Sequence, residues 1–199
     1  GGFVRDYIIK KTTPKDIDIV VVGNGIDFAN SVSKKLKNTP KVTIFKTYGT
    51  AMFKYNDMEI EFVGARKESY NLESRNPKVS IGTLEDDQNR RDFTINSMAF
   101  SLNKSNYGAL VDPFNGLSDI QSKIIKTPLD PEITYNDDPL RMLRAIRFAT
   151  NLDFKINKDS LKSITSLSSR IEIITKERIV VELNKIMLTN KPSTGFILL

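Results

Sequence analysis

The 199-residue sequence contains no cysteine and no histidine. Without cysteine, disulfides, thiolate metal sites and cysteine nucleophiles are excluded. Without histidine, the sequence cannot supply a histidine general base, a Ser-His-Asp triad or a zinc site of the usual kind. Any metal ion would therefore be a hard cation held by carboxylates.

Long apolar runs are also missing. No stretch approaches the roughly 20 apolar residues of a spanning helix, and no signal peptide is visible, so we expect a soluble, cytoplasmic protein without a membrane partner. The 30 Lys and Arg residues exceed the 24 Asp and Glu residues, and this +6 excess permits a polyanionic partner without demanding one. The abrupt start without Met and the apolar end lead us to expect a fragment of a longer polypeptide.

The first half of the sequence has the pattern of an α/β domain. A short helix should follow the opening glycines, and a longer one should cover 29–36. Strands are predicted at 17–22, 42–46, 50–55, 58–63 and 99–102, and a long polar loop at 67–82.

After about residue 117 the pattern becomes helical. Asp138 and Pro139 supply an N-cap and a first-turn proline for a helix reaching about residue 150. Further helices are predicted at 161–167 and 176–188. We therefore expect a sheet-containing domain over 1–116 and a helical domain over 117–199.

Acidic and apolar residues alternate in two of the predicted strands. Asp16 and Asp18 share one strand face, and so do Glu59 and Glu61. If the two strands are neighbours, three or more carboxylates converge and could hold two Mg²⁺ ions for phosphoryl transfer. The alternative is two unrelated amphipathic strands with solvated acidic faces.

Two further features suit phosphate binding. The pair Gly1-Gly2 before a helix would let backbone N–H groups approach a phosphate, and Arg5 would lie one turn into that helix. A glycine pair is more often only a turn. Arg141, Arg144 and Arg147 recur every three residues on a predicted helix. Their alternative is a solvated basic face paired with Asp137 and Asp138.

Taken together, these segments resemble the class II tRNA nucleotidyltransferases and the related bacterial poly(A) polymerases. The resemblance rests on seven stretches in the family's order: GGFVRD, DIDIVV, EFVGAR, LEDDQNRRDFTINSMA, DPFNGL, DDPLRMLRAIRFA and ERIVVEL. It implies a nucleotidyltransferase head (1–116) with a small, mixed, mostly antiparallel sheet and flanking helices, followed by a helical neck (117–199). In the family, body and tail domains that hold the tRNA acceptor arm follow the neck, and we expect this fragment to lack them.

The resemblance also implies roles for particular residues. Asp16 and Asp18 match the metal-ligand aspartates, and Glu61, five residues before Arg66, matches the third carboxylate, whereas Glu59 does not fit that spacing. The nucleotide-binding positions are matched by Gly2, Arg5, Arg91, Asp92, Asp138, Arg141, Arg144 and Arg147. Glu177 and Arg178 match a motif that supports the neck.

Asp138 and Arg141 match the pair that reads the incoming base. Cytosine and adenine each present an exocyclic amine beside an unprotonated ring nitrogen, which suit a carboxylate acceptor and a guanidinium donor. Uracil and guanine reverse both contacts, and each buried mismatch costs about 1–3 kcal/mol. The pair should therefore select CTP and ATP by a factor on the order of several hundred.

The implied activity is template-independent addition of CCA to the tRNA 3′ end from CTP and ATP, with two Mg²⁺ ions and release of pyrophosphate. Poly(A) polymerase, A-adding and CC-adding relatives share this chemistry and stay open. The loop before Arg90 has the family's full length, which favours complete CCA addition. An inert RNA- or nucleotide-binding module is the alternative of another class.

Overall fold

The computed structural model describes residues 1–11, 14–46, 49–71 and 74–199. Contacts between Cα atoms divide the chain into two compact units. Unit 1 consists of Gly1–Glu68 and Val79–Asn89, and unit 2 of Ser69–Lys78 and Arg90–Leu199. The expected head–neck boundary at residue 116 concerns functional modules and stays a prediction.

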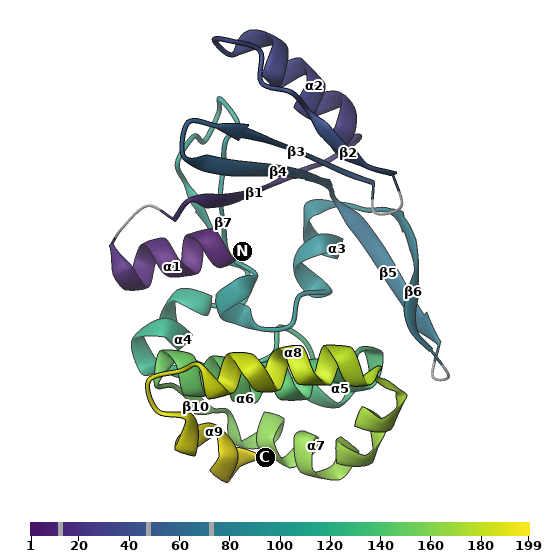
Figure 1. Ribbon diagram of the computed structural model, residues 1–199, viewed down its shortest axis with the longest axis vertical. Helices are drawn as coiled ribbons and strands as arrows, with labels where there is room; N and C mark the ends of the chain where they lie inside the picture. Colours follow the sequence, from purple (N-terminus) through teal and green to yellow (C-terminus); the bar gives the residue numbers. More distant parts are fainter. Residues whose placement is uncertain (12–13, 47–48, 72–73) are drawn as a thin grey trace. The chain divides into compact units, whose positions relative to one another are not determined.

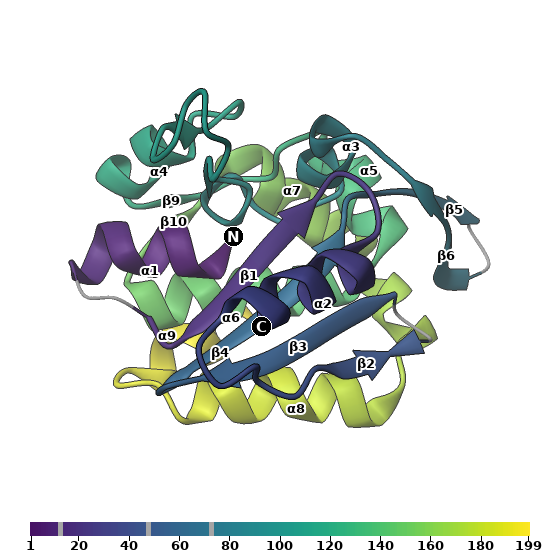
Figure 2. The same ribbon diagram turned by 90° about the horizontal axis from the view of Figure 1, so that it is seen from above.

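Unit 1 is built on a four-stranded sheet with the order β1-β4-β3-β2. Its strands are β1 (Asp16–Val21), β2 (Thr43–Phe45), β3 (Thr50–Tyr55) and β4 (Met58–Gly64). β1 runs parallel to β4, and the other two pairings are antiparallel, as Figure 2 lets the reader follow. The expected mixed, mostly antiparallel sheet is confirmed.

Two helices accompany this sheet. α2 (Gly25–Lys35) begins at Asn24, whose side chain accepts hydrogen bonds from the backbone N–H groups of Ile26 and Asp27. It lies along the sheet in Figure 1 and packs on a core that includes Ala29, Phe53 and Phe62. The predicted short N-terminal helix is α1 (Gly2–Lys10).

The prediction of a loop over 67–82 is wrong for the residues that the structure describes in this span. Residues 72 and 73 lie outside them. β5 (Arg66–Asn71) and β6 (Ser74–Ile81) form a two-stranded sheet, followed by α3 (Leu84–Asn89). The two strands pair with each other outside the four-stranded sheet. Their polar sequence therefore lacks the apolar pattern by which the other strands were predicted. Gly82 at its end is fixed by close packing, because an added Cβ would lie 2.6 Å from the Lys67 nitrogen.

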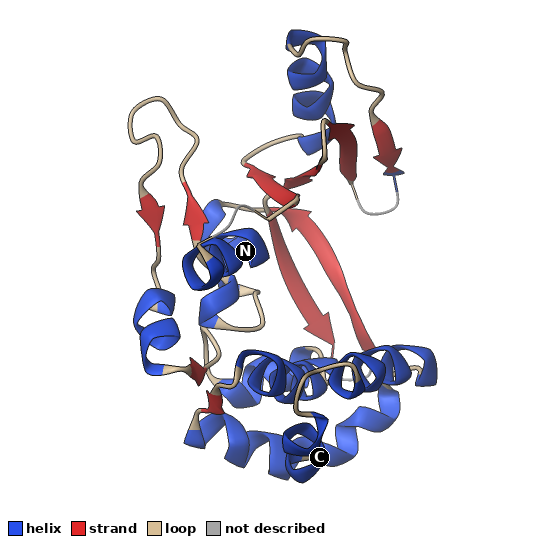
Figure 3. Cartoon of the chain, turned by 60° about the vertical axis from the view of Figure 1, so that its left-hand side comes forward, coloured by secondary structure: helices blue, strands red, loops and turns tan. Residues whose placement is uncertain are grey.

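Unit 2 is mainly helical, as the blue segments of Figure 3 show. Its α-helices after residue 115 are α4 (Gly116–Ser122), α5 (Pro131–Asp137), α6 (Leu140–Leu152), α7 (Lys158–Leu167), α8 (Lys176–Met187) and α9 (Pro192–Leu198). Shorter elements are η2 (Thr94–Asn96), η3 (Ser168–Ile173), and the strands β7 (Ala99–Phe100), β8 (Leu110–Val111), β9 (Ile124–Ile125) and β10 (Lys155–Ile156). Phe93, Ile125, Tyr135 and Phe148 are fully or almost fully buried in its core.

Local sequence explains where these helices begin. Asp138 Oδ1 accepts a hydrogen bond from the Leu140 N–H at 3.2 Å, as expected for the start of α6. An equivalent Asp-Pro start at Asp130, which accepts from the Glu132 N–H at 2.8 Å, opens α5. In the part of the chain that the structure describes, no helix has the length and apolar character needed to cross a bilayer.

Candidate active site

The acidic residues of unit 1 lie side by side on two paired strands. In the parallel register of β1 and β4, Asp16 is opposite Glu59 and Asp18 is opposite Glu61. Ile19 of β1 and Ile60 and Phe62 of β4 pack on the core under α2. Alternation along the strands therefore turns the four acidic residues to the opposite face of the sheet.

The four carboxylates differ in their surroundings. Asp16 and Asp18 are exposed and Glu61 is half-buried. Glu59 forms an ion pair with Lys54 of β3, its opposite residue, at 2.5 Å, and this contact raises the pKa of Lys54. Glu59 is thus neutralised by the sheet itself, which agrees with its exclusion from the family spacing.

The expected convergence of three or more carboxylates is wrong as a preassembled cluster. Among residues 1–11, 14–46, 49–71 and 74–199, no group of three Asp or Glu side chains is placed to hold a metal ion. Like charges on one face repel each other, and Glu59 turns to Lys54. The strands nevertheless pair as the hypothesis required.

The start of α1 adjoins this acidic face. A Cβ built on Gly1 would lie 3.9 Å from Asp18 Oδ2, so the helix N-terminus lies next to that aspartate. Gly2 is the first residue of the helix. Arg5 lies one turn on and donates from Nε to Asp6 Oδ1 at 2.8 Å. Backbone N–H groups at a helix N-terminus suit a phosphate, and the triphosphate site at Gly2 and Arg5 stays a prediction.

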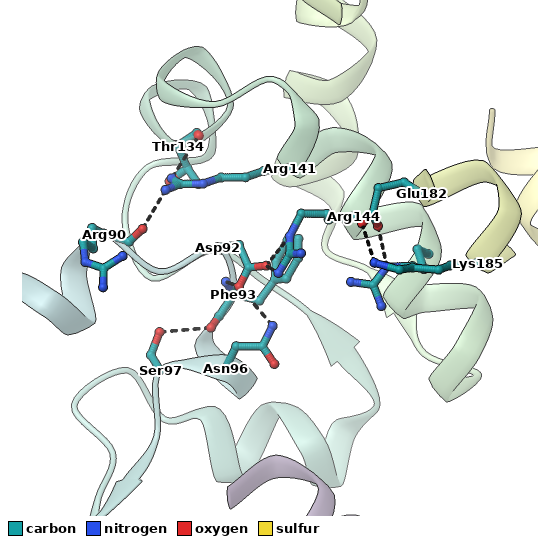
Figure 4. Close-up of polar contacts among 11 residues, drawn as sticks. Arg90, Asp92, Phe93, Asn96, Ser97, Thr134, Arg141, Arg144, Glu182 and Lys185 are labelled. Atoms are coloured by element: carbon teal, nitrogen blue, oxygen red, sulfur yellow. Dashed lines mark hydrogen bonds and ion pairs between the residues drawn. The ribbon is translucent and has the colours of Figure 1, made fainter. Parts of the chain in front are cut away.

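In unit 2, Asp92 is the centre of a buried hydrogen-bond network, drawn in Figure 4. Its Oδ1 accepts from the Phe93 N–H at 2.8 Å and from Asn96 Nδ2 at 3.0 Å. Its Oδ2 accepts from Arg144 Nε at 2.8 Å and Nη2 at 2.5 Å. Burial would raise the pKa of Asp92, but Arg144, Asn96 and Arg141 outweigh it, and the pKa is lowered.

The three predicted arginines of α6 have different partners. Arg141 is only 8% exposed and donates from Nη1 to the Thr134 carbonyl at 3.3 Å and from Nη2 to the Arg90 carbonyl at 2.7 Å. Arg144 binds Asp92, and the attraction of that carboxylate outweighs burial and raises the Arg144 pKa. The alternative of one solvated basic face is therefore wrong for Arg141.

Arg147 pairs with a residue of α8. Its Nε donates to Glu182 Oε2 at 2.5 Å, and Lys185 donates to the other carboxylate oxygen at 3.2 Å. Burial and the neighbouring Arg144 lower the pKa of Arg147 despite this contact. Glu182 is 3% exposed, and sequence reasoning missed it although it lies within the quoted stretch ERIVVEL.

Asn96 was missed as well, although its position four residues after Asp92 in DFTIN was a usable signal. Arg91 immediately precedes Asp92 and is half-buried. Asp138, also half-buried, stands at the start of the helix that carries the three arginines. The structure thus joins Asp92, Arg144 and their partners in one unit, and it places Asp16, Asp18, Glu61, Gly2 and Arg5 in the other.

The ion pair of Asp92 and Arg144 predicts a measurable stability effect. Arg144→Gln leaves a buried carboxylate without its cation, which costs about 3–5 kcal/mol for a fully buried pair and about 2–3 kcal/mol here, because the Arg144 side chain is 33% exposed. The Asp92 pKa is lowered on folding, so this contribution is present above the unfolded-state pKa of about 3.9 and is lost as the pH falls through the folded-state pKa.

The free energies of unfolding that urea gives for Arg144→Gln and the parent chain should therefore differ from neutral pH down to about pH 5 and converge at lower pH. Lys54→Gln, which breaks the exposed pair with Glu59, is the control and should change the unfolding midpoint little. If the difference in the free energy of unfolding between Arg144→Gln and the parent chain did not decrease in acid, the assignment to the ion pair would be contradicted.

Comparison with known proteins gives consistent matches. Residues 1–126 match the family described as "Poly A polymerase head domain". Residues 153–199 match the "Probable RNA and SrmB-binding site of polymerase A". Among relatives, the A-adding tRNA nucleotidyltransferase of Aquifex aeolicus is 41% identical over 162 residues, which are 81% of this chain and 19% of that protein. The CCA-adding enzyme of Pediococcus pentosaceus is 36% identical over an alignment that covers 98% of this chain and 47% of that protein.

Solved structures agree with these matches. A tRNA nucleotidyltransferase complexed with a primer tRNA and an incoming ATP analog superposes with a TM-score of 0.84 at 32% identity, over 100% of this chain and 54% of that one. A CCA-adding enzyme in apo form gives a TM-score of 0.88 at 33% identity, over 98% and 46%. The chain spans less than half the length of the two curated relatives named above.

Proposed function

Because the chain belongs to the family of the poly(A) polymerase head domain, we propose that it adds nucleotides to the tRNA 3′ end without a template, as a CCA-adding enzyme. The observation that carries this proposal is the register of β1 and β4, which sets Asp16 and Asp18 beside Glu59 and Glu61. In-line nucleotidyl transfer needs such carboxylates and no protein nucleophile, consistent with a chain that has neither cysteine nor histidine.

The acidic face fits Mg²⁺ by its donors. Mg²⁺ is usually held by one or two carboxylates, with waters and substrate phosphates completing the shell, so a preassembled cluster of three is not required. Asp16 and Asp18 would hold two ions, with Glu61 as the third catalytic carboxylate. When bound, these ions would activate the 3′-hydroxyl and neutralise charge on the triphosphate.

The other site residues are proposed to bind the nucleotide. Gly2 and Arg5 would contact the triphosphate at the start of α1, where the N–H groups and the guanidinium favour negative charge. Asp138 and Arg141 would read the base. The remaining positions proposed to orient the nucleotide are Arg91, Asp92, Arg144 and Arg147.

We assign these roles to a catalytic head over 1–116 and a base-reading neck over 117–199. Asp92 already accepts four hydrogen bonds from its own chain, so its contribution would be to hold Arg144 and the segment after Arg91 in place. We propose a cytoplasmic location, where tRNA, ATP and CTP are available.

Incorporation of labelled nucleotides into a tRNA lacking its terminal CCA tests this function. With Mg²⁺ and each nucleoside triphosphate in turn, we expect incorporation of CMP and AMP, release of pyrophosphate, and no incorporation of UMP or GMP. A chain that incorporates no nucleotide and shows no Mg²⁺-dependent binding of CTP or ATP would instead be an inert RNA- or nucleotide-binding module.

The Aquifex relative gives a second candidate, addition of AMP alone, because its name specifies A addition and its identity is 41%. A poly(A) polymerase has the same chemistry. Incorporation of AMP without CMP would favour this candidate, and the length of the product would separate a single addition from a poly(A) tail.

A further inference from the structure

The positive charge of the chain is concentrated in one segment. Residues 28–56 contain six lysines and no acidic residue. Removing these six from the 30 basic residues leaves 24, which equals the number of acidic residues in the chain. The whole formal excess of +6 therefore resides in this segment.

The residues of this segment that the structure describes, 28–46 and 49–56, lie in one part of unit 1. They cover most of α2, the turn after it, the edge strand β2 and the adjacent strand β3. The turn is closed by a hydrogen bond from the Ser33 hydroxyl to the Pro40 carbonyl. Leu36 and Val42 pack against the core, and the lysines between them, Lys37 and Lys41, are exposed.

Five of the six lysines remain available. Lys54 is paired with Glu59 on the acidic face, whereas Lys34, Lys35, Lys37, Lys41 and Lys46 are exposed. Within the part of the chain that the structure describes, none of these five forms an ion pair. Ile44 of β2 is opposite the core residue Ala51, so it lies on the α2 side of the sheet, and it is 42% exposed. We call these five lysines and Ile44 the α2–β2 surface.

A purely protective role explains only part of this surface. Lysines flanking an exposed edge strand prevent it from pairing with other chains, which accounts for Lys41 and Lys46. Lysines in the last turn of a helix also interact favourably with its dipole, which accounts for Lys34 and Lys35. Neither effect explains the absence of every acidic residue over 28–56, since one or two acids would leave both effects in place.

We propose that the α2–β2 surface binds the phosphate backbone of RNA. Its charge is complementary to a polyanion, whose phosphates lysine side chains neutralise. This contact is separate from the acidic face, because α2 packs on the other side of the sheet. The choice of RNA among polyanions rests on the proposed function.

The test is the triple variant Lys35→Gln/Lys37→Gln/Lys41→Gln, measured by fluorescence anisotropy with a labelled oligouridylate over a series of KCl concentrations. Removing one lysine–phosphate interaction reduces the slope of log K against log salt by about 0.7 for a single strand. We therefore expect a slope less steep by about 2 and an affinity at low salt at least about tenfold weaker.

The matched control, Lys104→Gln/Lys123→Gln/Lys126→Gln, removes the same charge from exposed positions of unit 2 that lie outside the RNA-binding match over 153–199, and it should keep the parent slope. Equal RNA binding by the two triple variants, or unchanged binding by the first, would overturn the proposal. So would loss of binding to phosphatidylserine vesicles without loss of RNA binding, because the surface would then be a membrane contact.

Binding of CTP with Mg²⁺, followed by thermal shift, keeps this proposal distinct from the proposed function. The triple variant should retain it, because none of its lysines lies on the acidic face. A parent chain that binds oligouridylate through these lysines but does not bind CTP would support the surface and contradict the nucleotidyltransferase.

Discussion

Asparagine in place of Asp16 or Asp18 should abolish nucleotide transfer while unit 1 stays folded. Both side chains are exposed on β1, so the isosteric change removes a charge and no packing. Carboxylates that hold Mg²⁺ account for several kcal/mol of charge stabilisation in the transition state, so incorporation should fall by about 10³-fold or more. The measurement is incorporation of labelled CMP and AMP into a tRNA lacking CCA, with circular dichroism to verify the fold.

Glu59→Gln provides the control for this loss. Glu59 lies on the same face, opposite Asp16, but its carboxylate is paired with Lys54. Its removal should therefore leave incorporation within a few-fold of the parent chain. Turnover that persists in Asp16→Asn or Asp18→Asn, or an equal loss in Glu59→Gln, would show that the metal ligands have been misassigned.

The second large effect concerns the choice of base. Asparagine at position 138 keeps a carbonyl oxygen for the Leu140 N–H, which now bonds to Asp138, but it also presents an amide donor. Uracil and guanine could then be accepted, so the preference for CTP and ATP, on the order of several hundred fold, should fall by about tenfold or more. Calorimetric binding of the four nucleoside triphosphates with Mg²⁺ measures this change.

Asp137→Asn removes the same charge from the neighbouring residue and should preserve the preference. The contacts of Arg141 with the Thr134 and Arg90 carbonyls hold its guanidinium in a set orientation at the start of α6. The expected base selectivity depends on this orientation. If both asparagine variants lose selectivity equally, local charge and not hydrogen-bond matching would govern the choice of base.

Several features of the fold follow from sequence patterns alone. The strand predicted at 50–55 has the bounds of β3. β1 is shifted by one residue from the strand predicted at 17–22, and β4 extends one residue beyond the strand predicted at 58–63. These strands can be predicted from the sequence because β-branched and aromatic residues alternate with polar ones, and the apolar residues must face one core. α6 is readable because Asp138 and Pro139 mark its start.

The β5–β6 hairpin has no such signal. Its two strands pair with each other outside the four-stranded sheet, and their sequence is polar, so it resembles that of a loop. The same limit applies to Glu182. A helical pattern places it on α8, but only the packing of α8 against α6 brings it to Arg147.

The carboxylates show the remaining limit. Alternation correctly places Asp16 with Asp18 and Glu59 with Glu61, and pairing of the two strands is a question of topology that the pattern leaves open. The ion pair between Lys54 and Glu59 depends in turn on the register of β3. Side-chain distances at such a site are set by charge balance across strands, which a one-dimensional pattern does not contain.

The interleaved order of the two units has a consequence for synthesis on the ribosome. Unit 1 is completed by Val79–Asn89, after ten residues that belong to unit 2. The nascent chain therefore cannot finish the first unit when residue 68 emerges, and at about 5–20 residues per second it must wait for the next segment. A truncation after Glu68 would lack part of unit 1, whereas one after Asn89 would contain all of it.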